Sequence, residues 1–422
     1  MEFDVVSAFE RVHRTLAPAL DIVAGRIQDE RIPAWCEERG WTDFLLGLSA
    51  VDVERSEALG LAETVRTFGS VLADLVELVA RVRAFAKLSK LDAMLVPGCN
   101  EDYRGVSFRK REQLSSLLGA LPALATPARR IVDVGAGSGH LTRLAASHFE
   151  RAALGLERCA ERVVSANARA DSQLRDPRFT PQYVVMDACR APLELTADDL
   201  AIGLHACGEL GDALVLAVAE SGAGLALVSC CLQKISAPAR LPLSSRGLAL
   251  ERETLGLSNL TSQAVGVETE IERTIAARRS RYALRCLLLA RGLDIPSGAE
   301  MRGINRRRAH AGLAELAARA LEQRGLPPAS PAELRAHELG AARNFERMRR
   351  LSLPRNMLSR LVELSVVLDR ALLLHERGYA LAVATLCERA VTPRNIALFA
   401  SRDRARLPQL SSEQTADSTV TV

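Results

Sequence analysis

The sequence of 422 residues predicts an α/β protein built on a seven-stranded, doubly wound sheet. Three observations predict it. Five short apolar runs alternate with helix-like stretches between residues 128 and 230, as in a parallel sheet with helices on both faces. A glycine-rich turn follows the first run. Two apolar runs near the end, joined by a loop with proline, suit a hairpin that completes the sheet.

Composition excludes several classes of protein. Hydrophobic residues make up 48% of the chain and charged residues 25%, which is typical of folded domains and excludes dominant disorder. No apolar stretch reaches the roughly 20 residues of a membrane span, and the acidic start predicts no secretory signal. The nine cysteines form no CxxC pair. We therefore expect reduced thiols in a cytoplasmic protein, without a membrane partner.

The elements follow in chain order. Residues 1–105 are predicted to form a helical N-terminal domain, because apolar residues at 16–27 and 63–90 recur at helical spacing. Pro97-Gly98 then breaks the chain. The core, residues 106–270, opens with a helix at 108–121. Its strands are predicted at 131–134, 152–156, 183–186, 200–204 and 225–230. Its later helices are predicted at 140–149, 160–170 and about 212–220.

The alternation stops after the fifth strand. Residues 271–376 are predicted to be an α-helical insert before the last strand pair. Its helices are expected at 281–291, 306–324, 331–350 and 356–377. Strands at 380–386 and 395–400 make the terminal pair, residues 377–402. The polar residues 403–422 are expected to be a disordered tail.

The glycine-rich turn is the most informative segment. It contains three glycines, Gly135, Gly137 and Gly139, after a strand that carries Asp133. A dinucleotide loop, G-x-G-x-x-G, would place its third glycine where this chain has His140. Asp133 would repel a pyrophosphate but suits the amino group of S-adenosylmethionine. The turn therefore favours that cofactor, and glycines that serve packing alone are the alternative.

Acidic residues end the next two strands as well. Glu157 lies 20 residues after Gly137 and can accept both hydroxyls of a ribose in either cofactor class. Asp187 follows the third strand and can accept from an adenine amino group. We predict that S-adenosylmethionine binds Asp133, Gly135, Gly137, Gly139, Glu157 and Asp187 at this edge of the sheet.

The fourth and fifth strands end in histidine and cysteine. His205 and Cys207 share a face of an extended chain, and the fifth strand runs into Cys230 and Cys231. His205 could be a base or bind substrate, and the cysteines could be nucleophiles, soft metal ligands or buried packing residues. We take His205 and Cys207 as the catalytic candidates. We expect no metal, because the paired loop spacing of zinc sites is missing.

The region from 108 to 236 resembles a class I methyltransferase domain. Three segments carry the likeness: VDVGAGSGHL from Val132, LHACGEL from Leu204 and SCCLQKIS from Ser229. Three eukaryotic groups share this domain. They are methyltransferase-like proteins once described as ribosomal RNA adenine dimethylase domain-containing, tRNA 2′-O-methyltransferases with a CHHC finger, and glutathione S-transferase C-terminal domain-containing proteins.

The first group resembles this chain outside that domain too, so the chain looks like its bacterial relative. The segments are WTDFL from Trp41, VVLDR from Val366 and TPRN from Thr392. The family's lead-in ends K-K-x-H-E where this chain has RKREQ at 109–113, and Leu232 replaces an aromatic. The resemblance implies a Rossmann-like, S-adenosylmethionine-dependent methyltransferase, with tRNA modification belonging to another branch.

Charge is unevenly distributed along the chain. The net charge is +4, but residues 271–360 hold 19 arginines and eight acids, a net of +11, and the remainder carries −7. Such a basic segment fits RNA or an acidic protein as partner. We therefore expect a methyltransferase that acts on a macromolecule, with RNA (rRNA or tRNA) favoured over protein. The alternatives are a catalytically inactive RNA- or protein-binding scaffold and, disfavoured by His140, an NAD-dependent oxidoreductase.

Overall fold

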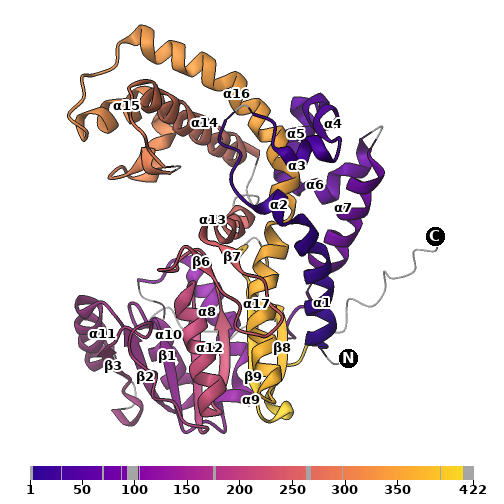
Figure 1. Cartoon of the computed structure of the whole chain (residues 1–422). Coiled ribbons are helices and arrows are strands. Elements are labelled where there is room, and N and C mark those ends of the chain that lie inside the picture. The colour runs from indigo at the N-terminus through magenta and orange to yellow at the C-terminus, as the bar shows by residue number, and fades with distance from the viewer. Residues whose placement is uncertain are drawn as a thin grey trace. The chain divides into compact units, whose positions relative to one another are not determined.

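The computed structural model divides into two compact units (Figure 1). It describes residues 3–29, 31–68, 71–86, 88–92, 103, 105–173, 177–262, 268–296, 298–389 and 391–411. The sheet unit contains residues 1–20, 83–262 and 359–422, and the helical unit contains residues 21–82 and 263–358. No helix among the described residues is long and apolar enough to span a membrane.

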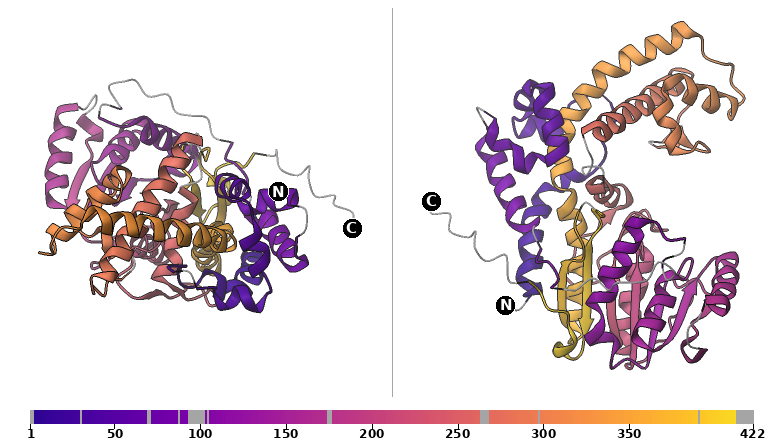
Figure 2. Two further views of the ribbon diagram at one scale, coloured as in Figure 1. Left: turned by 90° about the horizontal axis from the view of Figure 1, so that it is seen from above. Right: turned by 180° about the vertical axis from the view of Figure 1, so that it is seen from behind.

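The sheet unit confirms the predicted seven-stranded α/β sheet. Its strands are β1 (Arg130–Val134), β2 (Ala152–Glu157), β3 (Gln182–Val185), β4 (Asp199–Leu204), β5 (Gly224–Val228), β8 (Ala380–Thr385) and β9 (Ile396–Ser401). Their order is β3-β2-β1-β4-β5-β9-β8. The first five are parallel, and β9 is antiparallel to both β5 and β8. The terminal hairpin, yellow in Figure 2, therefore closes one edge of the sheet.

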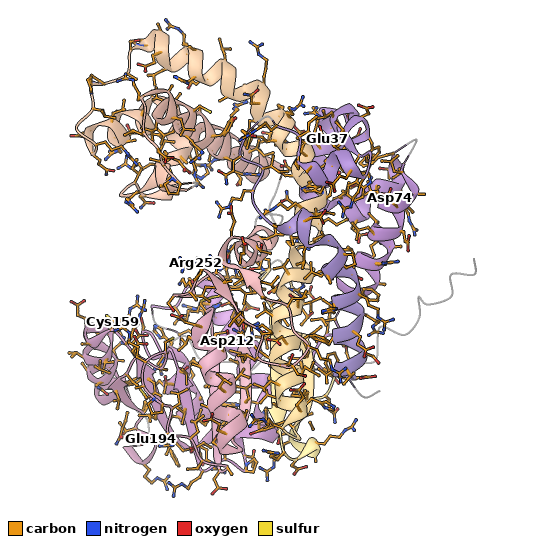
Figure 3. All side chains as sticks on the ribbon, in the orientation of Figure 1. Glu37, Asp74, Cys159, Glu194, Asp212 and Arg252 are labelled. Atoms are coloured by element: carbon orange, nitrogen blue, oxygen red, sulfur yellow. A yellow bond between two sulfur atoms is a disulfide. The ribbon has the colours of Figure 1, made fainter. Side chains whose placement is uncertain are left out.

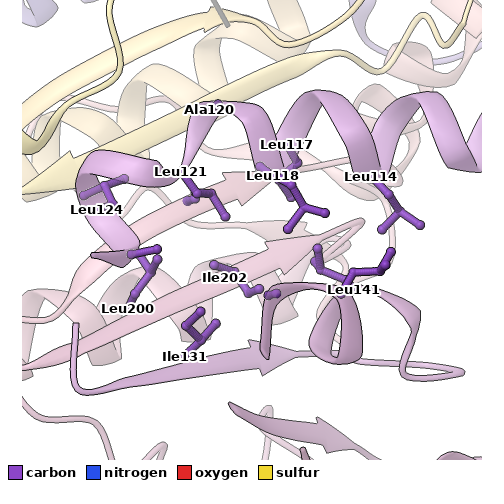
Figure 4. Close-up of a cluster of buried hydrophobic side chains, with 14 of the residues drawn as sticks. Leu114, Leu117, Leu118, Ala120, Leu121, Leu124, Ile131, Leu141, Leu200 and Ile202 are labelled. Carbon is purple, nitrogen blue, oxygen red and sulfur yellow. The ribbon is translucent and has the colours of Figure 1, made fainter. Parts of the chain in front are cut away.

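Helices cover both faces of this sheet. They are α8 (Phe108–Ala120), α9 (Pro122–Ala125), α10 (His140–Phe149), α11 (Ala160–Gln173), α12 (Glu209–Ser221) and α17 (Ser359–Glu376). On one face, Leu117 and Leu118 of α8 are buried in the same apolar cluster as Ile202 of β4 (Figure 4). On the other, a side chain added at Gly203 would meet Leu214 of α12, which shows the alternation of a doubly wound sheet.

Smaller elements complete the unit. They are η1 (Ala17–Ala19), η3 (Pro177–Phe179), β6 (Ala239–Arg240), β7 (Leu250–Glu251), α13 (Arg252–Leu255), η4 (Gly256–Ser262) and η7 (Arg404–Arg406). The predicted disordered tail is wrong for residues 403–411, because Ser411 N–H donates to the carbonyl of Lys90 (2.9 Å) and Leu410 pairs with Leu91. Backbone pairing thus orders a polar segment. Residues 412–422 of that tail lie outside the described residues.

The helical unit is formed by two separate stretches of the chain. Its elements are α2 (Leu20–Val23), α3 (Ala34–Glu38), α4 (Thr42–Gly47), α5 (Ala50–Leu59), α6 (Leu61–Thr64), η2 (Val65–Thr67), α7 (Ala73–Ala86), α14 (Glu268–Ala290), η5 (Ala299–Met301), η6 (Arg306–Ala311), α15 (Leu313–Glu322) and α16 (Pro331–Met357), with α7 running into the sheet unit. Residues 63–90 do not form one helix as their periodicity suggests. The predicted break at residues 97–98 lies outside the described residues.

The division differs from the predicted one. Residues 21–82 share a unit with residues 263–358, while α1 (Val5–Leu16) packs against α17 on the sheet. The two stretches of the helical unit are joined by Glu57 of α5, which forms ion pairs with Arg278 of α14 and Arg349 of α16. The acids of the first stretch offset the arginines of the second. The helical unit as a whole holds 24 arginines and 22 acids, a net of only +2.

Candidate functional site

The glycine loop after β1 has a backbone that favours glycine. Gly135, Gly137 and Gly139 have φ angles of +81°, +58° and +76°, a region that L residues with a side chain rarely adopt. A Cβ at Gly139 would also lie 2.6 Å from the ring of Tyr183. The hydroxyl of Tyr183, from β3, donates to the carbonyl of Gly139 (2.8 Å). Tyr183 thus supports the loop, a contact that local sequence spacing does not reveal.

Asp133 lies at the end of β1 as a buried carboxylate, with 2% of its surface exposed. Its Oδ2 accepts a hydrogen bond from Thr142 Oγ of α10 (2.7 Å). Burial raises the pKa of Asp133 to about 6, although Thr142 and the charge of Lys110 oppose that rise. A buried carboxylate with little compensation is stabilised by a ligand that carries positive charge. This environment fits the amino group of S-adenosylmethionine.

The acid at the end of β2 is hydrogen-bonded directly to the glycine loop. Glu157 Oε2 accepts from the N–H of Gly137 (2.9 Å), and its Oε1 accepts from the N–H of Cys159 (3.0 Å). Each carboxylate oxygen keeps a lone pair that a ribose hydroxyl could use. After β3, half-buried Asp187 accepts from the N–H of Cys189 (3.1 Å). The predicted cofactor residues therefore lie at three strand ends on one sheet edge, and their roles stay predictions.

His205 directly follows β4 and has a strained conformation. Its φ of +70° is uncommon for a residue with a side chain, and its N–H donates to the carbonyl of Val228 (2.8 Å). Its Nε2 lies 2.8 Å from Oε1 of Gln113, a buried residue of α8. Burial, then the charges of Lys110 and Arg394, lower the pKa of His205 to about 4. The ring is therefore neutral at pH 7 and a weak base, suited to hydrogen bonding.

The cysteines at this edge are close together. Cys207 and Cys230 form a disulfide with Cα atoms 5.3 Å apart, so the expectation of reduced thiols is wrong for this pair. Both sulfur atoms lie near the carbonyl oxygen of His205, at 3.0 and 3.7 Å. Cys231 remains a free thiol, and its Sγ accepts from the guanidinium of Arg394 (3.2 Å).

Arg370 is a positioning residue that the spacing of site residues did not indicate. It is fully buried on α17 and donates to Ser229 Oγ (2.6 Å), the carbonyl of Gly208 (2.8 Å) and Asp212 Oδ1 (2.8 Å). Asp212, labelled on α12 in Figure 3, also pairs with Arg240. One side chain thus joins the turn after β4 to the end of β5. The VVLDR segment that resembles the family was the only signal for it.

A family model matches the part of the chain that contains these residues. Its description is a methyltransferase domain, and it matches residues 109–238. The chain carries a methyltransferase domain. The matched region includes β1 to β5, the glycine loop, His205 and the three clustered cysteines. The glycine loop and buried Asp133 fit S-adenosylmethionine, the cofactor that the sequence predicts for such a domain.

A curated relative is similar over part of this domain. A glutathione S-transferase C-terminal domain-containing protein homolog from Drosophila pseudoobscura pseudoobscura is 30% identical over 142 residues. The match covers 33% of this chain and 23% of the relative, so this chain spans less than a quarter of that protein's length.

Solved structures, among them one of a methyltransferase, resemble the chain distantly. Magnesium protoporphyrin IX methyltransferase from Synechocystis PCC 6803 with bound SAH has a TM-score of 0.29 and 13% identity, covering 74% of this chain and 90% of its own. The YcgJ protein from Bacillus subtilis has a TM-score of 0.24 and 22% identity, covering 28% of this chain and 50% of its own. At these values neither structure indicates a substrate for this chain.

Proposed function

We propose that this chain transfers the methyl group of S-adenosylmethionine to RNA, either rRNA or tRNA. The observation that supports methyl transfer is the matched domain, with its glycine loop and acidic strand ends on one edge. Asp133 would face the amino group of the cofactor, Glu157 the ribose and Asp187 the adenine. The cofactor supplies an electrophilic methyl group on its sulfonium.

The chain's own residues would act mainly by positioning. The neutral ring of His205, held by Gln113, can orient an acceptor atom by a hydrogen bond. Arg370 fixes the two turns that carry His205 and the cysteines. Placing two reactants in contact can contribute roughly 7–11 kcal/mol to a barrier reduction without any covalent step.

The preference for RNA is supported by exposed arginines on the helical unit. Within residues 271–360, many arginines are paired, as Arg349 is with Glu57 and Glu346. Five exposed ones have no ion pair with the described residues: Arg273, Arg279, Arg302, Arg335 and Arg343. The side chains of Arg306 and Arg307 lie outside the described part. The surplus charge is therefore local, because the unit as a whole is nearly neutral.

Two of these arginines line a groove of about 530 Å³ on the helical unit. Arg279 of α14 and Arg335 of α16 lie there with His310 and with one acid, Glu338. The guanidinium fork binds phosphate oxygens in a bidentate manner. This groove is the part of the helical unit that we assign to the phosphate backbone of the substrate.

Labelled S-adenosylmethionine and fractions from a deletion strain test the substrate. We expect label in RNA. In the double variant Arg279→Gln, Arg335→Gln, we expect a KM at least tenfold higher and a salt dependence of binding reduced by about two charges. The matched control is Arg308→Gln, Arg319→Gln, whose arginines are paired with Glu315. It should change the KM less than the groove variant does.

The alternative functions predict different results in these experiments. Label in protein would replace RNA with an acidic protein substrate. No label in either fraction, with adenosylhomocysteine still bound, would favour the inactive scaffold. Binding of NADH without adenosylhomocysteine, measured by calorimetry, would favour the oxidoreductase.

A further inference from the structure

Three cysteine sulfur atoms meet at the edge where β4 and β5 end. The Sγ atoms of Cys207, Cys230 and Cys231 all lie within 4.8 Å of one another. Cys207 follows β4, and the other two follow β5. Arg370 joins the turn after β4 to the end of β5, so tertiary structure holds the sulfurs together. No step described above needs three thiols at one place.

We propose that, in the reduced chain, these three thiolates bind a divalent cation that prefers sulfur, with Zn²⁺ as the best fit. Tetrahedral zinc with bonds of about 2.3 Å separates its sulfur ligands by roughly 3.8 Å. The three Sγ atoms lie within 4.8 Å of one another, and reduction of the Cys207–Cys230 bond would free two of them to move apart to that spacing. Zinc is also the ion that clustered cysteines usually hold inside cells.

The disulfide between Cys207 and Cys230 is the oxidised, metal-free form of the same cluster. A cellular thiol such as glutathione reduces it: two glutathione molecules become one glutathione disulfide, and the protein gains two thiols. Binding of Zn²⁺ then displaces one proton from each of the three thiols. Three thiolates and one Zn²⁺ carry a net charge of −1.

Arg394 supplies the complementary charge. It donates to Cys231 Sγ (3.2 Å) and is itself held by Asn259 Oδ1 (2.7 Å). Its buried Nε has no hydrogen-bond partner in the described chain, so a donor is left for a further anionic group near this cluster. Donors to metal-bound sulfur commonly strengthen metal binding by tenfold or more. Arg394 is thus a supporting residue of the site.

The site has an open coordination position. Within the described residues, no fourth histidine, cysteine, aspartate or glutamate lies close enough to join the group. Zinc with three protein ligands characteristically takes a water or a substrate atom in the fourth position. A cation here would bind a hydroxyl or thiol of a substrate on the sheet edge that also carries the glycine loop. The site itself does not depend on whether that substrate is RNA.

Cobalt titration tests the proposal. The full-length chain is reduced with a phosphine, freed of metal with a chelator and titrated with Co²⁺ without oxygen. We expect one equivalent to bind, with thiolate-to-cobalt charge-transfer absorption and strong visible bands of tetrahedral cobalt, both displaced by Zn²⁺. Each of Cys207→Ser, Cys230→Ser and Cys231→Ser should lose the absorption, and Arg394→Gln should weaken binding about tenfold or more.

The controls are Cys159→Ser and Cys189→Ser, which change free cysteines of the same unit outside the cluster. Both should bind Co²⁺ as the native chain does. Binding of adenosylhomocysteine shows that each variant is folded. Retained absorption in the three cluster variants, or no Co²⁺ binding by the reduced native chain, would overturn the site. If the reduced native chain binds no Co²⁺, the intact mass decides what the cysteines do. A mass two hydrogens lower before reduction than after it would show a thiol–disulfide pair in place of a metal site.

Discussion

Replacing Asp133 with Asn should stabilise the folded chain in neutral solution. Burial raises the pKa of Asp133 from 3.8 to about 6, so the folded state holds this proton more tightly than the unfolded state. The free energy of unfolding therefore falls as the pH rises from about 4 to about 6. Above that range the folded state bears the full free-energy cost of ionising buried Asp133. The pKa difference corresponds to about 3 kcal/mol. Asn is neutral and its Oδ1 can still accept from Thr142.

Urea unfolding followed by circular dichroism measures this effect. We expect the free energy of unfolding of Asp133→Asn to exceed that of the native chain by up to about 3 kcal/mol at pH 8 and to match it near pH 4. Taking the difference cancels other groups that titrate in both proteins, such as His140, whose pKa burial lowers to about 4. A variant that is less stable at pH 8, or a difference independent of pH, would refute the reasoning.

Cofactor binding separates a functional from a structural Asp133. Adenosylhomocysteine has the amino group and lacks the sulfonium, so it probes the carboxylate alone. In the native chain its affinity should rise as the pH increases from 5 to 7, because the carboxylate ionises. In Asp133→Asn the affinity should fall at least tenfold at pH 8 and lose this pH dependence. Equal affinity of both proteins would contradict the assignment of Asp133 to the cofactor.

Asp199 provides the opposite control on the neighbouring strand. Its burial alone would raise the pKa, but the hydrogen bonds from Arg130 and from Thr196 outweigh that effect and lower the pKa of Asp199. Its contribution to stability is therefore present above pH 3.8 and is lost as the pH falls through the folded pKa. Asp199→Asn should destabilise the chain at pH 8, with a loss that shrinks in acid.

Two further predictions concern packing near the loop and strand ends. Gly139→Ala should lower the free energy of unfolding by about 2–4 kcal/mol and abolish adenosylhomocysteine binding, whereas Gly137→Ala, which has no close neighbour, should lower it by about 1 kcal/mol. Urea unfolding measures the stability of both variants, and calorimetry measures their ligand binding. Equal losses of stability would contradict the contact between residue 139 and Tyr183. Arg370→Met should lower the free energy of unfolding by about 3 kcal/mol or more, because it leaves Asp212 with fewer hydrogen-bond partners. The control Arg14→Ala changes an exposed arginine and should change the free energy of unfolding by less than about 0.5 kcal/mol. Similar losses in both variants would refute the positioning role of Arg370.

Sequence reasoning predicted the sheet well because its signals are local. Apolar runs alternate with helical stretches, and the glycine spacing after β1 limits the ligand class. The same reasoning missed Gln113 and Arg394, because a polar side chain in a helix or loop has no periodicity that reveals its partner. The departure at 109–113 gains meaning only in the structure, where Gln113 holds His205. The domain division was missed for a similar reason, since Glu57 pairs with residues more than 200 positions away.

The sequence by itself determined the seven-stranded α/β core, the glycine loop and the acids at three strand ends. Hydrophobic period, glycine spacing and strand order are all encoded within short windows. Only the tertiary structure decided where the charge lies and which side chains meet. It offset the basic segment with the acids of residues 21–82, and it placed Cys207 beside Cys230 and Cys231. The physical reason is that ion pairs, buried guanidinium bonds and sulfur clusters depend on distances in space between residues far apart in the chain.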